Sequence, residues 1–285
     1  MRIMGQEIMV GFVSNTEKIA ANVRAHDRVA SNYEQLHGEI YNPIEQKRLG
    51  DLLSEVIGNI ETGSKQNVAL DFGCGAGNLT IHLSALGCDV IAADVSTGCL
   101  DLVMSRSYPT NIRPVKLNGI DLSGVPDVSV DMVATYSVLH HVPDYLGVLS
   151  EFVRVLKPGG IVFIDHEASH EFWNPTSERR AFLEELKSSR GWDWKKYFKP
   201  SSYINWIILK YINPKYRPEG DIHVFPDDHI EWDKIADRLV SHGAEVIKSE
   251  SYLLFRRGYD RDIYNKYEGS THDTRYLIAR KKGAP

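Results

Sequence analysis

The sequence is poor in cysteine and has no long apolar run. Its three cysteines lie in one stretch of the 285 residues: Cys74, Cys88 and Cys99. An odd, clustered set of cysteines is not the pattern of a secreted disulfide framework. No segment approaches the roughly 18 apolar residues that span a bilayer, since the nearest, Ile204 to Ile212, is interrupted by Lys210. The apolar patch from Ile8 to Val13 is too short for a signal-peptide core. We therefore expect a cytoplasmic protein with reduced thiols and no transmembrane segment.

An excess of basic charge is also absent. The chain has 33 Lys and Arg against 38 Asp and Glu residues, which gives a net charge of -5. This balance argues against nucleic-acid binding over the whole surface, although it leaves a local basic patch open. With 42% hydrophobic and 25% charged residues, and no internal repeat, the composition is that of an ordinary globular protein.

The sequence does contain a regular alternation of strand-like and helix-like segments. Strand patterns lie at 68–72, 89–93, 114–117, 130–135, 161–164, 246–255 and 276–279. Helical patterns lie at 43–60 behind the cap Asn42, at 79–86, at 100–104 behind the cap Ser96, at 145–157 and at 233–242. Strands that alternate with helices form parallel sheets covered on both faces. We predict an α/β fold with a doubly wound, mostly parallel seven-stranded sheet.

The alternation breaks between residues 168 and 230. This segment holds four of the five tryptophans. From Lys187 to Arg217 it has eight basic residues against the single acid Asp193, interleaved with aromatic residues. Aromatic and cationic side chains together suit an anionic, flat or lipophilic substrate, a membrane surface, or single-stranded nucleic acid. Helices that pack their aromatic residues on the core would show the same composition. We expect an inserted helical lid at residues 168–230.

A glycine-rich loop, Asp71 to Gly77, stands where the first strand leads into the first helix. Glycines allow sharp turns and let a ligand approach backbone amides at a helix N-terminus. Asp94 follows at the carboxyl end of the second strand, where a carboxylate can accept hydrogen bonds from both hydroxyls of a ribose. Together they predict a site for an adenosine-containing cofactor. Each alone has a plainer interpretation, since the loop could be a tight turn and Asp94 a helix cap.

The segment from Leu70 to Gly77 resembles motif I of the class I S-adenosylmethionine-dependent methyltransferases. Three further landmarks follow in the order of that family: Ile91-Ala92-Ala93-Asp94-Val95-Ser96, Asp131-Met132-Val133 with Leu139-His140-His141-Val142, and Leu156-Lys157-Pro158-Gly159-Gly160. The likeness is close from 68 to 164 and weaker after 230. It implies the family's fold, S-adenosyl-L-methionine as cofactor, and a small-molecule methyltransferase. The expected division is an N-terminal helical segment that closes over the cofactor at 1–66, a core at 67–167 and 231–285, and the lid.

The resemblance also implies a set of cofactor-binding residues. Asp71 and Gly73 would lie by the methionine moiety, Asp94 on the ribose and Val95 against the adenine. Asn118, where many relatives carry Asp, would approach the adenine amino group, and its amide can still accept a hydrogen bond there. The full set is Asp71, Gly73, Gly75, Gly77, Asp94, Val95, Asn118, Gly119, Ile120, Tyr136 and Tyr33.

Transfer of a methyl group requires a nucleophile held in line and sheltered from water. A hydroxyl or carbon-acid acceptor also needs a general base. His140 and His141, just beyond the fourth strand, are the candidate catalytic residues, with capping and packing as their plainer roles. No metal is expected. The lid favours a small-molecule acceptor that is anionic, aromatic or lipophilic. We expect no nucleic-acid partner, with RNA kept as the alternative acceptor, and the sequence does not fix the oligomeric state.

Three other functions stay open on the sequence. An NAD-dependent oxidoreductase also binds adenosine, but its third glycine would come one residue later. A zinc peptidase is suggested by His166-Glu167-Ala168-Ser169-His170, yet this motif follows a strand, whereas the zinc motif needs a helix. His166 or Glu167 could instead face a substrate. A non-catalytic scaffold that binds S-adenosylmethionine is the third possibility.

Overall fold

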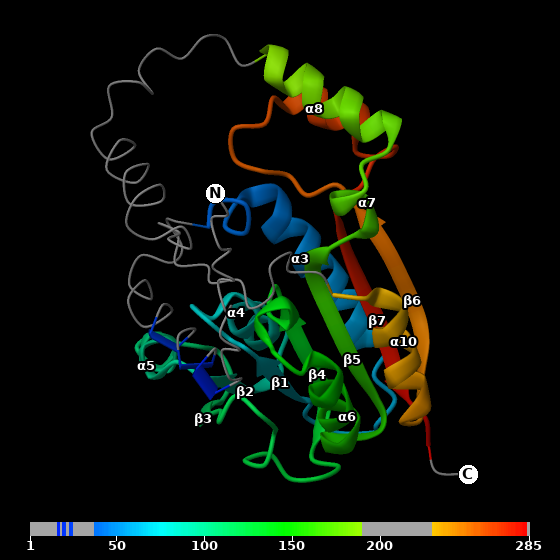
Figure 1. Ribbon diagram of the computed structural model, residues 1–285. Coiled ribbons are helices and arrows are strands. Elements are labelled where there is room, and N and C mark those ends of the chain that lie inside the picture. Colours follow the sequence, from blue (N-terminus) through cyan, green and yellow to red (C-terminus); the bar gives the residue numbers. More distant parts are fainter. Residues whose placement is uncertain (1–15, 18, 21–22, 25–36, 190–229, 284–285) are drawn as a thin grey trace, which may run out of the picture.

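A seven-stranded sheet forms the centre of the computed structural model, which describes residues 16–17, 19–20, 23–24, 37–189 and 230–283. The strand order is β3-β2-β1-β4-β5-β7-β6 (Figure 1). The strands are β1 Val68–Phe72, β2 Asp89–Asp94, β3 Ile112–Lys116, β4 Val130–Tyr136, β5 Leu156–Ala168, β6 Ala244–Tyr252 and β7 Thr274–Lys281. Only β7 runs antiparallel to its neighbours, β5 and β6. The predicted doubly wound, mostly parallel seven-stranded sheet is confirmed.

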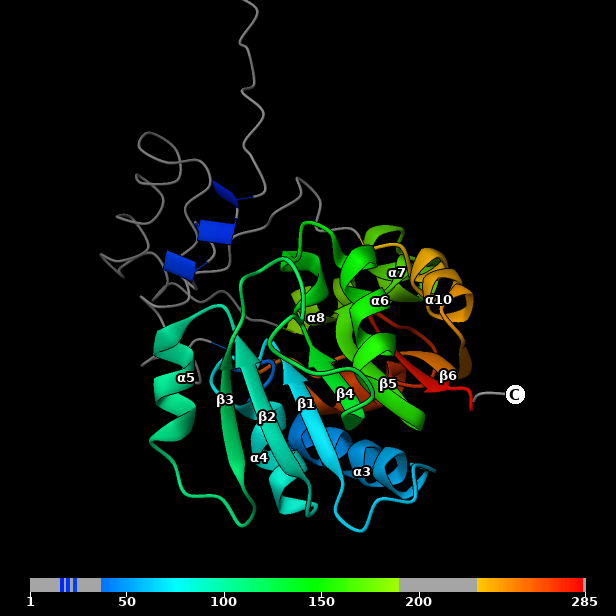
Figure 2. The same ribbon diagram turned by 90° about the horizontal axis from the view of Figure 1, so that it is seen from below.

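Helices cover both faces of the sheet (Figure 2). One face carries α3 Pro43–Gly58, α4 Asn78–Ala85 and α5 Thr97–Met104, and the other carries α6 Tyr145–Val155 and α10 Trp232–Ser241. Alternate strand residues supply the two cores: Leu70 packs in the α6 and α10 layer, and Ala69 packs in the α3 and α4 layer. Burial on both faces explains why the central strands have nearly continuous apolar sequences. No described helix is both long and apolar enough to cross a membrane.

Two helix starts follow the predicted capping chemistry. The Asn42 side chain accepts hydrogen bonds from the backbone N–H groups of Ile44 and Glu45, and Pro43 occupies the first turn. The Ser96 hydroxyl accepts a hydrogen bond from the Cys99 N–H at the start of α5. Each cap fixes the direction in which a helix leaves the ligand-binding edge of the sheet.

Strand β5 is longer than the sequence predicts. The helical pattern was expected to continue to Lys157, but α6 ends at Val155 and β5 begins at Leu156, which pairs with Val130. The register then shifts, so that Ile161 pairs with Met132. Pro158, Gly159 and Gly160 therefore lie within β5, at a β-bulge or similar irregularity in its pairing with β4. At its other end β5 runs past Ile164 and brings the His166 region into the sheet.

Three helices lie beyond the carboxyl ends of the parallel strands: α7 His170–Trp173, α8 Ser177–Ser189 and α11 Arg261–Tyr267 (Figure 1). Phe182 of α8 packs in one apolar cluster with Ile263 and Tyr264 of α11. Lys266 donates to Glu185 across the same contact, at 2.7 Å. The described start of the expected lid is therefore held by a segment from the β6–β7 connection. Residues 190–229 of that lid, like Tyr33, lie outside the described residues.

Candidate active site

The glycine loop lies between β1 and α4, beside the point where the strand order reverses. Ligands of open α/β sheets bind at this switch point. Gly73 and Gly77 have φ values of 72° and 87°, in the left-handed region that favours glycine. A Cβ on Gly73 would lie 2.6 Å from both methyl groups of Val138. The N–H groups of Gly73 and Cys74 donate to the carbonyl of Ala93, so the loop folds back over the end of β2.

Asp94 ends β2 and contacts this loop directly. Its Oδ2 accepts a hydrogen bond from the Gly75 N–H at 2.9 Å, and its Oδ1 accepts one from the Ser96 N–H at 2.7 Å. The carboxylate is buried and lines a pocket above the loop. The plainer role expected for Asp94, capping, belongs to Ser96.

This pocket, which we name the first pocket, gathers most of the predicted site residues. Nine of them line it: Asp71, Gly73, Gly75, Asp94, Val95, Gly119, Ile120, Tyr136 and His141. Gly77, the last residue of the loop, lies outside the lining as the N-cap of α4, where an added Cβ would meet Val103 at 3.1 Å. Asn118 and His140 also lie outside the lining of the first pocket.

Asp71 is a fully buried carboxylate on the floor of the first pocket. It accepts a hydrogen bond from the Thr80 hydroxyl at 2.6 Å. Burial raises its pKa to about 7, and the nearby charge of Asp94 acts in the same direction. A cationic group placed beside Asp71 would reverse this shift, so the carboxylate is suited to bind an ammonium.

Asn78, directly after the loop, was not predicted as a site residue. Its Oδ1 accepts a hydrogen bond from Gln46 Nε2 at 2.8 Å, while its Nδ2 is buried with no hydrogen-bond partner. Asn78 lines the first pocket at the start of α4, where an anion is favoured. The amino-acid end of S-adenosylmethionine has one ammonium and one carboxylate, so Asp71 and Asn78 fit its two charged groups. Asn78 could have been predicted as a site residue from the sequence, because it directly follows the last glycine of the loop.

The loop after β3 differs from the expectation for Asn118. Its Nδ2 donates to Asp121 at 2.8 Å, and its Oδ1 accepts from the N–H groups of Ile120 and Asp121. The Asn118 amide therefore shapes its own turn, and Asp121 lines the first pocket. The acidic residue three positions after Asn118 was the signal available for this site.

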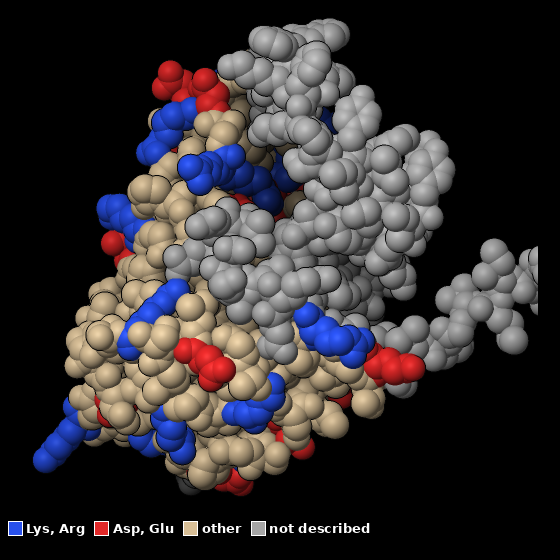
Figure 3. All heavy atoms as spheres, turned by 90° about the vertical axis from the view of Figure 1, so that its left-hand side faces the viewer, with Lys and Arg blue, Asp and Glu red and all other residues tan. Residues whose placement is uncertain are grey.

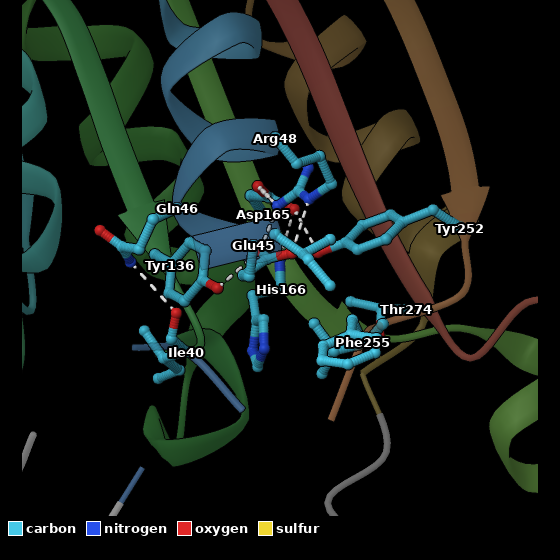
Figure 4. A network of polar contacts seen from close by, with 12 residues as sticks. Ile40, Glu45, Gln46, Arg48, Tyr136, Asp165, His166, Tyr252, Phe255 and Thr274 are labelled. Atoms are coloured by element: carbon cyan, nitrogen blue, oxygen red, sulfur yellow. Dashed lines mark hydrogen bonds and ion pairs between the residues drawn. The ribbon is translucent and has the colours of Figure 1, made fainter. Parts of the chain in front are cut away.

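Tyr136, at the end of β4, lines the first pocket and joins a buried polar network (Figure 4). Its hydroxyl donates to Glu45 Oε1 at 2.8 Å. Arg48 donates to Glu45 and to Asp165, and Tyr252 donates to Asp165 at 3.0 Å. Burial raises the pKa of Tyr136 well above its ordinary value, which keeps the hydroxyl a donor. The network fixes α3 against β4 and β5.

A second pocket lies next to the first, and three residues line both: Ile40, Ser137 and His141. His140 lines only the second pocket. Its Nδ1 lies 2.7 Å from Oε2 of Glu167, a buried carboxylate whose Oε1 accepts from the N–H groups of Val138 and Leu139. Glu167 on β5 therefore positions both the turn after β4 and the His140 ring.

His166 lies on β5, not on a helix, and has a φ of 61°. The register between β5 and β7 shifts between Ile164 and Glu167. The His166 ring stacks on Tyr136 with 4.5 Å between centroids. His170 is the first residue of α7, so the two histidines of the zinc-like motif do not share a helix face. Among the described residues, no group of three or more His, Cys, Asp or Glu side chains could hold a metal ion.

Known proteins are similar to this chain in sequence and in fold. The family described as methyltransferase domain matches residues 70–164. A ubiquinone biosynthesis O-methyltransferase of Proteus mirabilis is 24% identical over 67% of this chain and 80% of its own length. A malonyl-[acyl-carrier protein] O-methyltransferase of Yersinia pestis is 37% identical over 33% of this chain and 34% of its own.

One solved structure shows the same fold around a related ligand. Magnesium protoporphyrin IX methyltransferase from Synechocystis, with bound S-adenosylhomocysteine, superposes with a TM-score of 0.52 over 92% of this chain and all of its own, at 14% identity. These relatives lend no support to an NAD-dependent oxidoreductase, an RNA methyltransferase, a zinc peptidase or a non-catalytic scaffold. The chain belongs to the class I S-adenosylmethionine-dependent methyltransferases and transfers the methyl group of that cofactor to a small-molecule acceptor.

Proposed function

We propose that the reaction is O-methylation of an acceptor held in the second pocket, with His140 as general base. The observation that carries this proposal is the hydrogen bond from His140 Nδ1 to the buried Glu167, beside residues that line both pockets. The relatives named above are O-methyltransferases, which supports oxygen as the reacting atom.

The Glu167 carboxylate selects the tautomer of His140. An ionised carboxylate only accepts hydrogen bonds, so Nδ1 of His140 carries the proton and Nε2 is the basic atom. The two N–H groups that donate to Glu167 Oε1 hold the carboxylate in place. His140 is thereby oriented to take the acceptor's hydroxyl proton as the oxygen becomes a nucleophile.

The first pocket would hold the methyl donor. S-adenosylmethionine supplies an electrophilic methyl group when it is bound. We assign Asp71 to the cofactor's ammonium, Asn78 to its carboxylate and Asp94 to the ribose hydroxyls. Val95, Gly119, Ile120 and Asp121 would enclose the adenine, with Asp121 in the role expected for Asn118. Tyr136 and the loop glycines Gly73 and Gly75 would line the methionine side.

Residues that line both pockets mark where donor and acceptor would meet. Ser137 and His141 follow β4, and Ile40 comes from the segment before α3. We propose that His141 helps to align the two reactants. It lines both pockets and packs against His140 with 4.0 Å between ring centroids. Alignment of this kind supplies much of the rate enhancement in a displacement reaction.

The test is transfer of labelled methyl from S-adenosylmethionine into a small-molecule extract, with mass spectrometry and NMR to identify an O-methyl product. His140→Gln should lower turnover by about 10²-fold or more and leave affinity for S-adenosylhomocysteine unchanged. His242→Gln, an exposed histidine after α10, is the matched control. Full turnover by His140→Gln, or label on nitrogen or carbon, would overturn the proposal.

We further place the protein in the cytoplasm, because Cys74, Cys88 and Cys99 are buried and form no disulfide, which suits a reducing compartment. We also propose that the lid at residues 168–230 faces the substrate, and that its helices α7 and α8 act together with α11. The packing of Phe182 against Ile263 supports this division.

A further inference from the structure

The second pocket has unused hydrogen-bond donors. We propose that the acceptor carries an anionic group, distinct from its reacting hydroxyl, which Arg256 and His166 bind. The proposal rests on the assignment of the second pocket to the acceptor. Figure 3 shows a hollow on one face of the molecule in which blue basic side chains are visible next to smaller red acidic areas.

The carboxylates that line the second pocket already have partners. Glu167 accepts from two backbone N–H groups and from His140. Glu39 pairs with His37 at 2.9 Å. Asp273 accepts from the Leu254 N–H and the Thr274 hydroxyl through Oδ1. Its Oδ2 accepts no hydrogen bond from the described residues but lies 3.3 Å from Arg179 and 3.6 Å from Arg256, so it faces two cations. None of these acids therefore calls for a cationic ligand.

Arg256 is only loosely engaged. Its guanidinium lies 3.6 Å from Asp273 Oδ2, which is too long for a hydrogen bond. Arg179 lies closer to the same oxygen, at 3.3 Å, so the single carboxylate faces two positive charges. The Arg256 side chain donates no hydrogen bond to any of the described residues. A guanidinium with unused, planar donors is suited to a carboxylate or a similar anion.

His166 adds a second donor beside Arg256. Both ring nitrogens are buried and lack a hydrogen-bond partner, and the ring lines the second pocket. Burial lowers its pKa well below the ordinary value, with further lowering by Arg256 and Arg48, so the ring is neutral and has one N–H to donate. Its positive φ is a strained conformation for a non-glycine residue. The bulge in β5 thus holds an unpaired imidazole in the pocket.

The position of these donors defines the acceptor class. Arg256 and His166 line the second pocket and not the first, whereas the reactants would meet at the shared residues. The anion is therefore an anchor and not the methylated group. Phe172, Trp173 and Leu254 give the same pocket an apolar wall. The geometry points to a hydroxy acid with an apolar body, methylated on its hydroxyl.

Binding of simple probes tests the anchor directly. Benzoate and benzamide have the same shape, and only benzoate is charged. Titrated into protein saturated with S-adenosylhomocysteine, benzoate should bind at least about tenfold more tightly. Arg256→Gln should remove this preference, Arg256→Lys should keep part of it, and Arg257→Gln, an exposed neighbour outside the pocket, should leave it unchanged. Equal affinity for both probes, or a preference that survives Arg256→Gln, would overturn the proposal.

His166→Asn provides a second variant, because Asn tolerates a positive φ and retains an N–H donor. It should weaken benzoate binding less than His166→Ala does, with unchanged affinity for S-adenosylhomocysteine. Equal losses in the two variants would contradict a donor role for His166.

The charge of the methylated product separates this proposal from the proposed function. An extract is divided on an anion exchanger, and both fractions are incubated with labelled S-adenosylmethionine. The acceptor should lie in the retained fraction, and the labelled product should still be retained. A labelled O-methyl ether from the neutral fraction would refute the anion anchor and leave the proposed O-methylation standing. A retained acceptor that becomes a neutral ester would show that the anion itself is methylated.

Discussion

Asp94 Oδ2 lies 2.9 Å from the amide nitrogen of Gly75, so the acid that ends β2 is bonded to the glycine loop that follows β1. The contact joins the two motifs of the cofactor site into one rigid unit. Asp94 also accepts from the Ser96 N–H at the start of α5. Asp94, which we assign to the ribose hydroxyls, is thus oriented before the cofactor arrives, which lowers the entropic cost of binding.

Gly73→Ala should destabilise the protein by about 1–3 kcal/mol and weaken binding of S-adenosylhomocysteine. The added Cβ would lie 2.6 Å from Val138, in a backbone conformation with a φ of 72°. Gly63 has the same φ, and no atom lies within 4 Å of an added Cβ there. Gly63→Ala therefore measures only the destabilisation caused by a non-glycine residue in this backbone conformation. Urea unfolding of both variants gives the difference. Equal destabilisation would show that the contact with Val138 is harmless.

Relative to wild type, Asp71→Asn should raise the free energy of unfolding of the cofactor-free protein at pH 8, and should raise it much less at pH 4. Burial raises the folded-state pKa of Asp71 to about 7, far above its unfolded value, so the folded state binds the extra proton between these values. The free energy of unfolding of the wild-type protein therefore contains a favourable contribution from Asp71 at low pH. This contribution is lost as the pH rises toward 7, and it amounts to roughly 4 kcal/mol at most. Urea unfolding at the two pH values measures the effect. A difference between variant and wild type that does not change with pH would contradict this account.

Asn78→Asp should weaken binding of S-adenosylhomocysteine by about tenfold or more. The substitution preserves the oxygen that accepts from Gln46 and replaces the unpaired Nδ2 donor by a charged oxygen. Methylthioadenosine, which lacks the amino-acid end, should bind both proteins equally. Calorimetry with the two ligands makes the comparison. If both ligands lost affinity equally, Asn78 would have no specific role at the amino-acid end.

Glu167→Gln should reduce turnover by about 10- to 100-fold with little change in cofactor affinity. The amide oxygen can still accept from the Val138 and Leu139 N–H groups, but the side chain no longer enforces a proton on Nδ1 of His140. Glu171→Gln on α7, outside the lining of both pockets, is the control for methyl-transfer rates. Undiminished turnover would remove Glu167 from its positioning role.

The sequence predicted the sheet and the glycine loop after β1 because both depend on local signals. Apolar runs of four to seven residues, caps such as Asn42 and the glycines after β1 each act over a few residues. The helix α11 was missed because it buries only Ile263 and Tyr264 and so lacks a clear apolar period. Its N-cap Asp260, which accepts from two backbone N–H groups, was the available signal.

The acceptor site could not be predicted in the same way, because it depends on contacts between distant segments. Glu167 meets His140 only when β4 and β5 pair, and Arg256 reaches the second pocket from beyond β6. The orientation of His166 follows from a register shift between β5 and β7, which leaves no mark in the local sequence.

The central claim is that the first pocket binds S-adenosylmethionine through Asp94 and the glycine loop. Isothermal titration of S-adenosylhomocysteine into wild-type protein and Asp94→Ala tests it most directly, with NAD as the competing ligand. We expect one site per chain, no binding of NAD, and an affinity in Asp94→Ala lower by about 1–3 kcal/mol, which is roughly 5- to 150-fold. Equal affinity in the two proteins, or binding of NAD in place of S-adenosylhomocysteine, would contradict the account.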